Sequence, residues 1–164
     1  SRSVALNHLE DRIRVHTMDL KDAPDRLGHS AFDAVLCNPP YGKRGGALRN
    51  PRDELAIARH EIATDLAAVV RSAAALLRNG GRFFLIHQAD RLPEIARRLH
   101  EAGAPLKRVR LVHTSLERRA HLVLCEAVRF AGEGCIVLPP LLLQDAQGRP
   151  SQELLRIYQG ERTV

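Results

Sequence analysis

The sequence predicts an α/β fold in which helices pack on a mainly parallel sheet. Short apolar or alternating segments, typical of strands, are separated by longer segments whose apolar residues recur every three or four positions, as on one helical face. The two kinds of segment alternate along the chain, and the last two strands follow each other without a helix. This order favours an α/β sandwich with an antiparallel C-terminal strand pair.

The first half of the chain is expected to form two strands, a long helix and a third strand. Residues 13–18 alternate between apolar and polar side chains, and residues 32–37 form a nearly continuous apolar run. Between residues 55 and 76 the apolar positions fall on one helical face. Asn79-Gly80-Gly81 should end this helix, because glycine readily adopts the left-handed conformation beyond a last turn. Residues 82–87 then resume as an apolar strand.

The second half is expected to add one helix and two more strands. Residues 92–99 have the spacing of an amphipathic helix, with Asp90 as its N-cap and Gly103 at its end. Residues 109–113 and 121–128 have the apolar character of strands.

We expect residues 1–164 to form a single domain, with residues 136–164 as a C-terminal extension packed on it. A chain of 164 residues with 45% hydrophobic residues is long enough for one sizeable core. The polar tail should pack through Leu154, Leu155 and Ile157.

The charge balance favours a polyanionic partner. The chain has 25 basic and 19 acidic residues, a formal charge of +6, and such an excess attracts nucleic acid. Nearly all the basic residues are arginine, whose planar guanidinium suits phosphate, although genomic base composition would produce the same bias.

Other classes of protein are disfavoured. Cys37, Cys125 and Cys135 are odd in number and widely spaced, unlike a disulfide framework or a zinc site. The eight histidines show no ligand spacing, so we expect no metal. No apolar run reaches the roughly 20 residues that cross a bilayer, and no secretory pattern opens the chain. We therefore expect a cytoplasmic monomer without a membrane segment.

Asn38-Pro39-Pro40-Tyr41 follows the predicted strand 32–37, and ligands bind at the carboxyl ends of strands in open α/β sheets. The prolines restrict the backbone and remove amide donors, so the Asn38 side-chain oxygen and the Pro39 carbonyl can both accept hydrogens from one planar amine. Tyr41 offers a flat face for stacking. Taken alone, the four residues could equally form an ordinary Asn-Pro turn.

The surrounding residues carry a resemblance to a known family. Residues 33–41 resemble the fourth motif of class I amino-methyltransferases, which act on adenine, guanine or glutamine side chains. Four further segments resemble the bacterial tRNA (adenine-N6)-methyltransferases that modify valine tRNA beside its anticodon: residues 58–61, 76–83, 138–140 and 155–158. The resemblance covers essentially the whole chain. It implies a Rossmann-like methyltransferase sandwich, S-adenosylmethionine as cofactor, and methylation of the N6 amine of adenine in tRNA.

The resemblance also assigns roles to residues. It implies that Asn38-Pro39-Pro40-Tyr41 holds the target adenine, with Asn38 also beside the cofactor. Asp19 and Leu20 would contact the cofactor's adenine, and Arg59-His60-Glu61 would line the RNA entrance. Asp19 could instead cap the next segment with Leu20 in the core, and the charged triplet could be a solvated helix face.

A basic cluster close to the motif is a candidate for phosphate contacts that position RNA without reading its bases. A solvated loop is the alternative. The cluster consists of Lys43, Arg44, Arg49, Arg52 and Arg59.

The chain departs from the family at its start. A glycine-rich turn after the first strand and an acidic residue after the second should hold the cofactor, and neither is present, since residues 1–7 look like the tail of the following helix. We therefore expect the N-terminal cofactor-binding strands to be missing and this chain alone to be inactive. Two alternatives are a protein glutamine N5-methyltransferase and an inactive RNA-binding fragment.

Overall fold

The computed structural model describes residues 2–39 and 66–160, which form one sheet with helices. The strand order is β1-β2-β4-β3-β5, and β6 also pairs with β3. All described strands run in one direction except β4, which is antiparallel to both β2 and β3. The strands are β1 Phe32–Cys37, β2 Leu77–Gln88, β3 Leu106–His113, β4 Leu122–Val128, β5 Ile136–Val137 and β6 Leu141–Leu142. This arrangement confirms the predicted α/β class with its antiparallel C-terminal pair.

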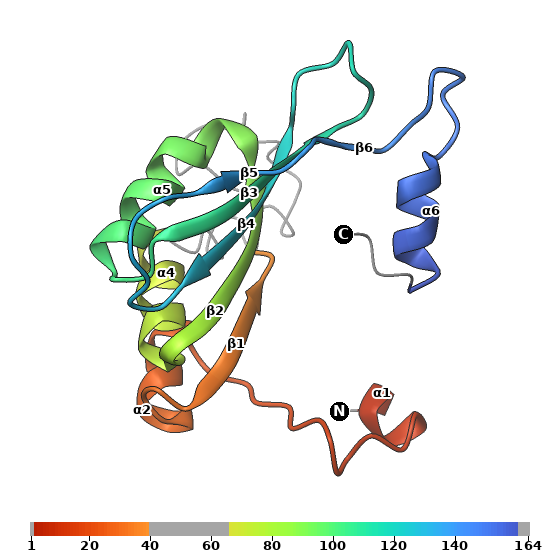
Figure 1. The fold of residues 1–164 in the computed structure, drawn as a ribbon. Coiled ribbons are helices and arrows are strands. Elements are labelled where there is room, and N and C mark those ends of the chain that lie inside the picture. The colour runs from red at the N-terminus through yellow and green to blue at the C-terminus, as the bar shows by residue number, and fades with distance from the viewer. Residues whose placement is uncertain (1, 40–65, 161–164) are drawn as a thin grey trace, which may run out of the picture.

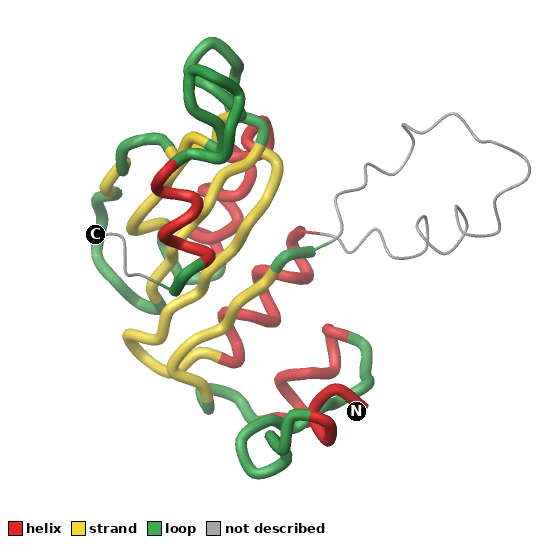
Figure 2. The backbone as a smooth tube through the Cα atoms, turned by 90° about the vertical axis from the view of Figure 1, so that its right-hand side faces the viewer, coloured by secondary structure: helices red, strands yellow, loops and turns green. Residues whose placement is uncertain are grey.

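Helices α2, α4 and α5 cover one face of the sheet, whereas α1 and α6 stand on its other side (Figures 1 and 2). The helices are α1 Arg2–Leu6, α2 Ala23–Leu27, α4 Leu66–Leu76, α5 Leu92–Glu101 and α6 Gln152–Tyr158, with 3-10 turns η1 Leu20–Asp22 and η2 Ala89–Arg91.

The core lies between these three helices and the sheet. Phe83 of β2, Val123 of β4 and Leu99 of α5 are among its fully buried side chains. Burying one such side chain stabilises the fold by about 1.5–3 kcal/mol. The alternation of buried and half-buried residues along β4 shows that each central strand presents one side to this core.

The strand expected at residues 13–18 is not formed. This segment has no regular structure, and Ile13 and Val15 are 44% and 55% exposed. A strand needs a neighbour for its backbone N–H and C=O groups, and no strand of residues 2–39 or 66–160 pairs with this segment. The alternating residues 13–18 could therefore pair as a strand, but the described part of the chain offers them no partner strand.

The transition from α4 to β2 comes earlier than predicted. The helix ends at Leu76 and β2 begins at Leu77, because Leu77 already pairs with Phe32. The pairing then jumps to Ala34 opposite Arg82, so Asn79-Gly80-Gly81 forms a bulge inside β2 instead of a helix stop. A side chain on Gly81 would meet the Phe32 carbonyl oxygen at 3.1 Å. The first part of the predicted helix, residues 55–65, lies outside the described residues.

The start of α5 also differs from the prediction. Asp90 belongs to η2 and makes no cap; Arg91 occupies the N-cap position without a side-chain cap bond. Arg91 instead forms an ion pair within the first turn, where its Nε donates to Glu94 Oε2 at 2.8 Å. The predicted end is confirmed: Gly103 has a φ of +68° and its N–H donates to the His100 carbonyl.

The C-terminal extension adds β5 and β6 to the outer edge of β3 and then forms α6. The predicted packing is wrong for Leu155 and Ile157, which are each 39% exposed, whereas Leu154 is half-buried. Polar contacts hold α6 instead, because both carboxylate oxygens of Glu153 accept from Arg110 Nη2 at 2.7 Å. The organisation as one domain with an extension stays a prediction.

Candidate active site

The carboxyl ends of β1, β2 and β3 share one edge of the sheet, because these strands run in the same direction. The predicted motif begins at this edge, where Asn38 is exposed and Pro39 is buried directly after β1. Pro40 and Tyr41 lie outside the described residues, so the stacking role of the tyrosine stays a prediction.

The end of β1 is fixed by the proline. Leu36 and Cys37 pair in parallel with Phe84 and Leu85 of β2. Pro39 has no N–H group and cannot continue the ladder. The pairing therefore stops at Cys37, and the chain leaves the sheet with Asn38 at its edge. This is the position from which an amide side chain can reach a ligand.

Asp19 and Leu20 make the structural contacts that the sequence allowed as an alternative to cofactor binding. Asp19 is the N-cap of η1, and its Oδ1 accepts the Lys21 N–H at 2.9 Å. Leu20 is half-buried against the hydrophobic core. Their proposed contact with the cofactor's adenine stays a prediction, since a capping carboxylate retains further acceptor capacity.

The residues expected to bind RNA lie in the part of the chain that the structure does not describe. They are Lys43, Arg44, Arg49, Arg52, Arg59, His60 and Glu61. Their roles stay predictions.

His87 is a buried polar group next to the proposed site. It precedes the last residue of β2 and is 5% exposed. Its Nδ1 accepts the Gln88 N–H at 2.8 Å, so the neutral ring carries its proton on Nε2. Burial, followed by the positive charge of Arg91, lowers the pKa of His87. The ring is therefore a neutral group at physiological pH, on the strand that pairs with β1.

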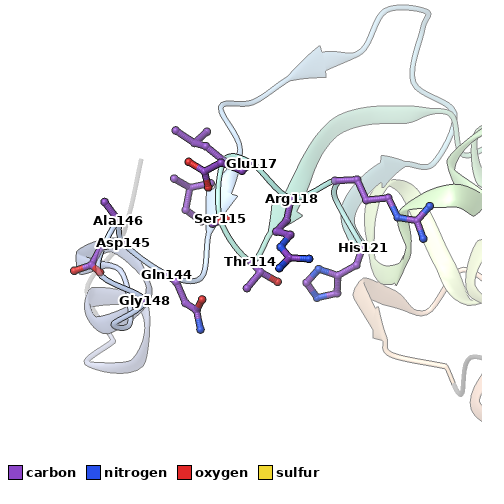
Figure 3. Close-up of a pocket in the computed structure, with 12 residues that line it drawn as sticks. Thr114, Ser115, Glu117, Arg118, His121, Gln144, Asp145, Ala146 and Gly148 are labelled. Carbon is purple, nitrogen blue, oxygen red and sulfur yellow. The ribbon is translucent and has the colours of Figure 1, made fainter.

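A cleft of about 790 Å³ that the sequence analysis missed lies beyond the end of β3 (Figure 3). Its walls are the loop between β3 and β4, residues 114–121, and the end of β6 with the segment that follows it, residues 142–148. The pair Arg118-Arg119 between two predicted strands was the signal available in the sequence. This pair alone does not predict a cleft, because the second wall is formed by residues 142–148, which lie farther along the sequence.

The thiols and histidines of the described residues make no metal centre. No group of three or more His, Cys, Asp or Glu residues within residues 2–39 and 66–160 is placed to hold a metal ion. Burial raises the pKa of the Cys125 thiol to about 12, which keeps it protonated and unreactive. In the same parts of the chain, no helix is long and apolar enough to cross a bilayer.

Comparison with known proteins finds that the chain is similar to methyltransferases. No family model matches the chain. It is 30% identical over 135 residues to a tRNA1(Val) (adenine(37)-N6)-methyltransferase of Phocaeicola vulgatus, an alignment covering 82% of this chain and 55% of that protein. The chain thus spans about half the length of this curated relative.

Solved structures agree on the fold. A predicted O-methyltransferase from Agrobacterium tumefaciens superposes with a TM-score of 0.72 at 21% identity, covering 99% of this chain and 74% of that one. A putative DNA modification methylase from Thermus thermophilus gives a TM-score of 0.51 at 18% identity, covering 92% and 61%. The predicted resemblance to tRNA (adenine-N6)-methyltransferases is confirmed by the sequence similarity. The superpositions show that the chain has the Rossmann-like methyltransferase fold.

Proposed function

We propose that the protein is an S-adenosylmethionine-dependent N-methyltransferase that acts in the cytoplasm on the exocyclic N6 amine of adenine in tRNA. The observation that carries the proposal is the position of Asn38-Pro39 directly after β1, at the edge of the sheet where α/β proteins bind ligands. The fold and the relative in Phocaeicola vulgatus support it.

The turn fits the geometry of an aromatic amine. The Asn38 side-chain oxygen and the Pro39 carbonyl are two acceptors, and an exocyclic NH2 group offers two donors. Holding both hydrogens fixes the nitrogen and directs its lone pair out of the hydrogen-bonded plane, toward an incoming methyl group. Tyr41 would then stack on the ring and keep the base from rotating.

The same two acceptors would stabilise the reaction. As the nitrogen forms its bond to carbon, positive charge develops on it and its hydrogens become better donors. Fixed carbonyl dipoles aimed at these hydrogens lower the barrier without reorganising. The nitrogen would then release one proton to solvent, and the donor, having lost its methyl group from sulfur, would remain as a neutral thioether.

The residues present fit part of the cofactor. Asp19 offers an exposed carboxylate and Leu20 a half-buried apolar surface, which suit the amine and the ring of an adenine. Residues 1–31 contain no glycine-rich turn for the methionine end. S-adenosylmethionine would supply a methyl group activated on a sulfonium sulfur.

RNA is favoured over protein as substrate by the formal charge of +6 and by the relative. A glutamine side chain remains the second candidate, because its amide NH2 presents the same two hydrogens to Asn38 and Pro39.

The test is transfer of a labelled methyl group by the whole protein, offered unmodified bulk tRNA and, separately, bulk protein of the same cell. Nuclease digestion of the tRNA should release the label as N6-methyladenosine. Label recovered as N5-methylglutamine would overturn the proposal in favour of the protein substrate. RNA binding without transfer, unchanged by S-adenosylmethionine, would identify an inactive RNA-binding module.

A further inference from the structure

The cleft beyond β3 is joined to the sheet by backbone hydrogen bonds at its base. Leu143 N–H donates to the His113 carbonyl and Gln144 N–H to the Thr114 carbonyl, each at 2.9 Å. These bonds continue the pairing of β6 with β3 and join the two walls at their base. The first wall is also fixed internally, since His113 Nδ1 donates to the Arg118 carbonyl at 2.7 Å.

One wall of the cleft carries an excess of positive charge. The two cations Arg118 and Arg119 line it together with the single acid Glu117, and His121 adds a polar ring. No carboxylate within residues 2–39 and 66–160 forms an ion pair with either arginine. Within the described part of the chain, no carboxylate therefore competes with an anionic ligand for these two guanidinium groups.

The negative charge of Asp145, the acid on the second wall, is already balanced by its hydrogen-bond partners. Asp145 Oδ1 accepts the N–H groups of Gln147 and Arg149 at 2.9 and 3.0 Å, and Oδ2 accepts Arg149 Nε at 2.9 Å. These bonds to Arg149 and its turn lower the pKa of Asp145, so it stays ionised and paired. It contributes little net repulsion to an anion in the cleft.

The polar groups of the cleft suit a sugar-phosphate chain better than a base. Figure 3 shows Arg118, Thr114 and His121 on one wall and Gln144 opposite them, a set of donors typical of phosphate and ribose contacts. Among the described residues, the lining contains no Phe, Tyr or Trp on which a base could stack.

The cleft is too far from Asn38 for one nucleotide to reach both. Three strand spacings separate β1 from β3 in the order β1-β2-β4-β3, which at about 4.8 Å each is about 14 Å along the same edge. A polyanion of several nucleotides would span this distance.

We infer that this cleft binds the sugar-phosphate backbone of the substrate RNA a few nucleotides from the methylated adenine, with Arg118 and Arg119 as the phosphate contacts. The inference rests on the proposed function and adds to it a second docking point, which sets the register of the RNA on the sheet edge.

The test compares two double variants of the whole protein in binding an unmodified valine tRNA transcript across a salt series. Arg118→Gln with Arg119→Gln should weaken binding at low salt about tenfold or more. It should also lower the log-log salt slope by about one to two, because each lost phosphate contact removes about 0.7–0.9. Arg71→Gln with Arg97→Gln removes the same charge from exposed positions on α4 and α5. This control should leave the slope unchanged.

Two results would overturn the inference: an unchanged slope in the cleft variant, or an equal decrease in both variants, which would mean diffuse attraction. Thermal unfolding of both variants checks that they are folded.

A second substrate separates this inference from the proposed function. A dinucleotide containing the target adenine is too short to engage both points, so the cleft variant should methylate it at the wild-type rate. A wild-type protein that methylates neither RNA, while the salt slope still depends on Arg118 and Arg119, would refute the methylation and retain the cleft as an RNA-binding surface. A lower rate on the short RNA would contradict a purely docking role.

Discussion

At the scale of single residues, Asn38 should matter for the chemical step and not for cofactor affinity. Asn38→Ala removes one of two acceptors for the amine, and loss of one preorganised polar contact slows transfer by about 10²-fold or more. Single-turnover measurements with saturating tRNA and the whole protein would report this step, with Asn7→Ala, an exposed position far along the chain, as control. Near-normal turnover in the Asn38 variant would remove this residue from the mechanism.

His87 should make the fold sensitive to mild acid. Its pKa is lowered in the folded protein from the ordinary value of 6.5, so below that pH the unfolded chain takes up a proton that the folded protein resists. The free energy of unfolding therefore falls as the pH drops through 6.5, and this loss ends below the lowered pKa.

The variant His87→Asn tests this assignment, because an asparagine oxygen can replace Nδ1 as acceptor for the Gln88 N–H. Urea unfolding at several pH values between 7 and about 5 should show a shallower decline for the variant than for the wild type. Parallel declines would mean that another group causes the acid sensitivity.

Residue roles could be predicted from sequence where local backbone chemistry decides them. The end of β1 before Pro39 follows from the missing N–H of proline. Asp19 was ambiguous, because the same carboxylate that caps η1 is also a possible ligand group. Arg118 and Arg119 were not recognised, because their cleft exists only when β6 pairs with β3 and brings residues 142–148 beside them.

At the scale of secondary structure, Ser151 should control the attachment of α6. It is the buried N-cap of this helix: its Oγ accepts the Leu154 N–H at 3.1 Å and donates to the Leu142 carbonyl at 2.6 Å. Ser151→Ala removes both bonds and should cost about 1–2 kcal/mol. Amide hydrogen exchange in α6 should accelerate correspondingly, while the neighbouring Gln152→Ala leaves it unchanged. Equal protection in the Ser151 variant would show that other contacts, such as the ion pair of Arg110 with Glu153, hold the helix.

Elements were predictable where their own pattern decides them, as in β1 and the end of α5. The segment 13–18 shows the limit, since its alternation is that of a strand but pairing decides whether one forms. The boundary between α4 and β2 shows another limit. Asn79-Gly80-Gly81 is a competent helix stop, yet the pairing of Leu77 with Phe32 ends the helix first and turns the glycines into a bulge.

At the scale of the whole molecule, the outer edge of β1 should lower the solubility of the 164-residue chain when it is expressed alone. Within residues 2–39 and 66–160 no strand pairs with that edge, and Leu36 is 78% exposed. Open strands with apolar side chains invite association between chains. We expect the 164-residue chain, expressed alone, to be poorly soluble and not to bind S-adenosylmethionine.

Calorimetric titration with the cofactor measures this directly, with the whole protein as the positive control, and light scattering reports the association. Micromolar cofactor binding by the 164 residues would show that they suffice for the site and that our placement of the chain in the fold is wrong.

The route of the chain through the sheet affects the order in which its parts open. Only the short loop 114–121 connects β3 with β4. In contrast, pairing Cys37 of β1 with Leu85 of β2 closes a loop that contains all the residues between them. Closing longer loops costs more conformational entropy, and β1 has one described neighbour whereas β2 and β4 each have two. Opening β1 therefore costs less than opening the centre. A ligand that binds at Asn38 only when β1 is in place must then stabilise the strand by mass action, so the occupancy of the site and the integrity of the sheet are thermodynamically linked.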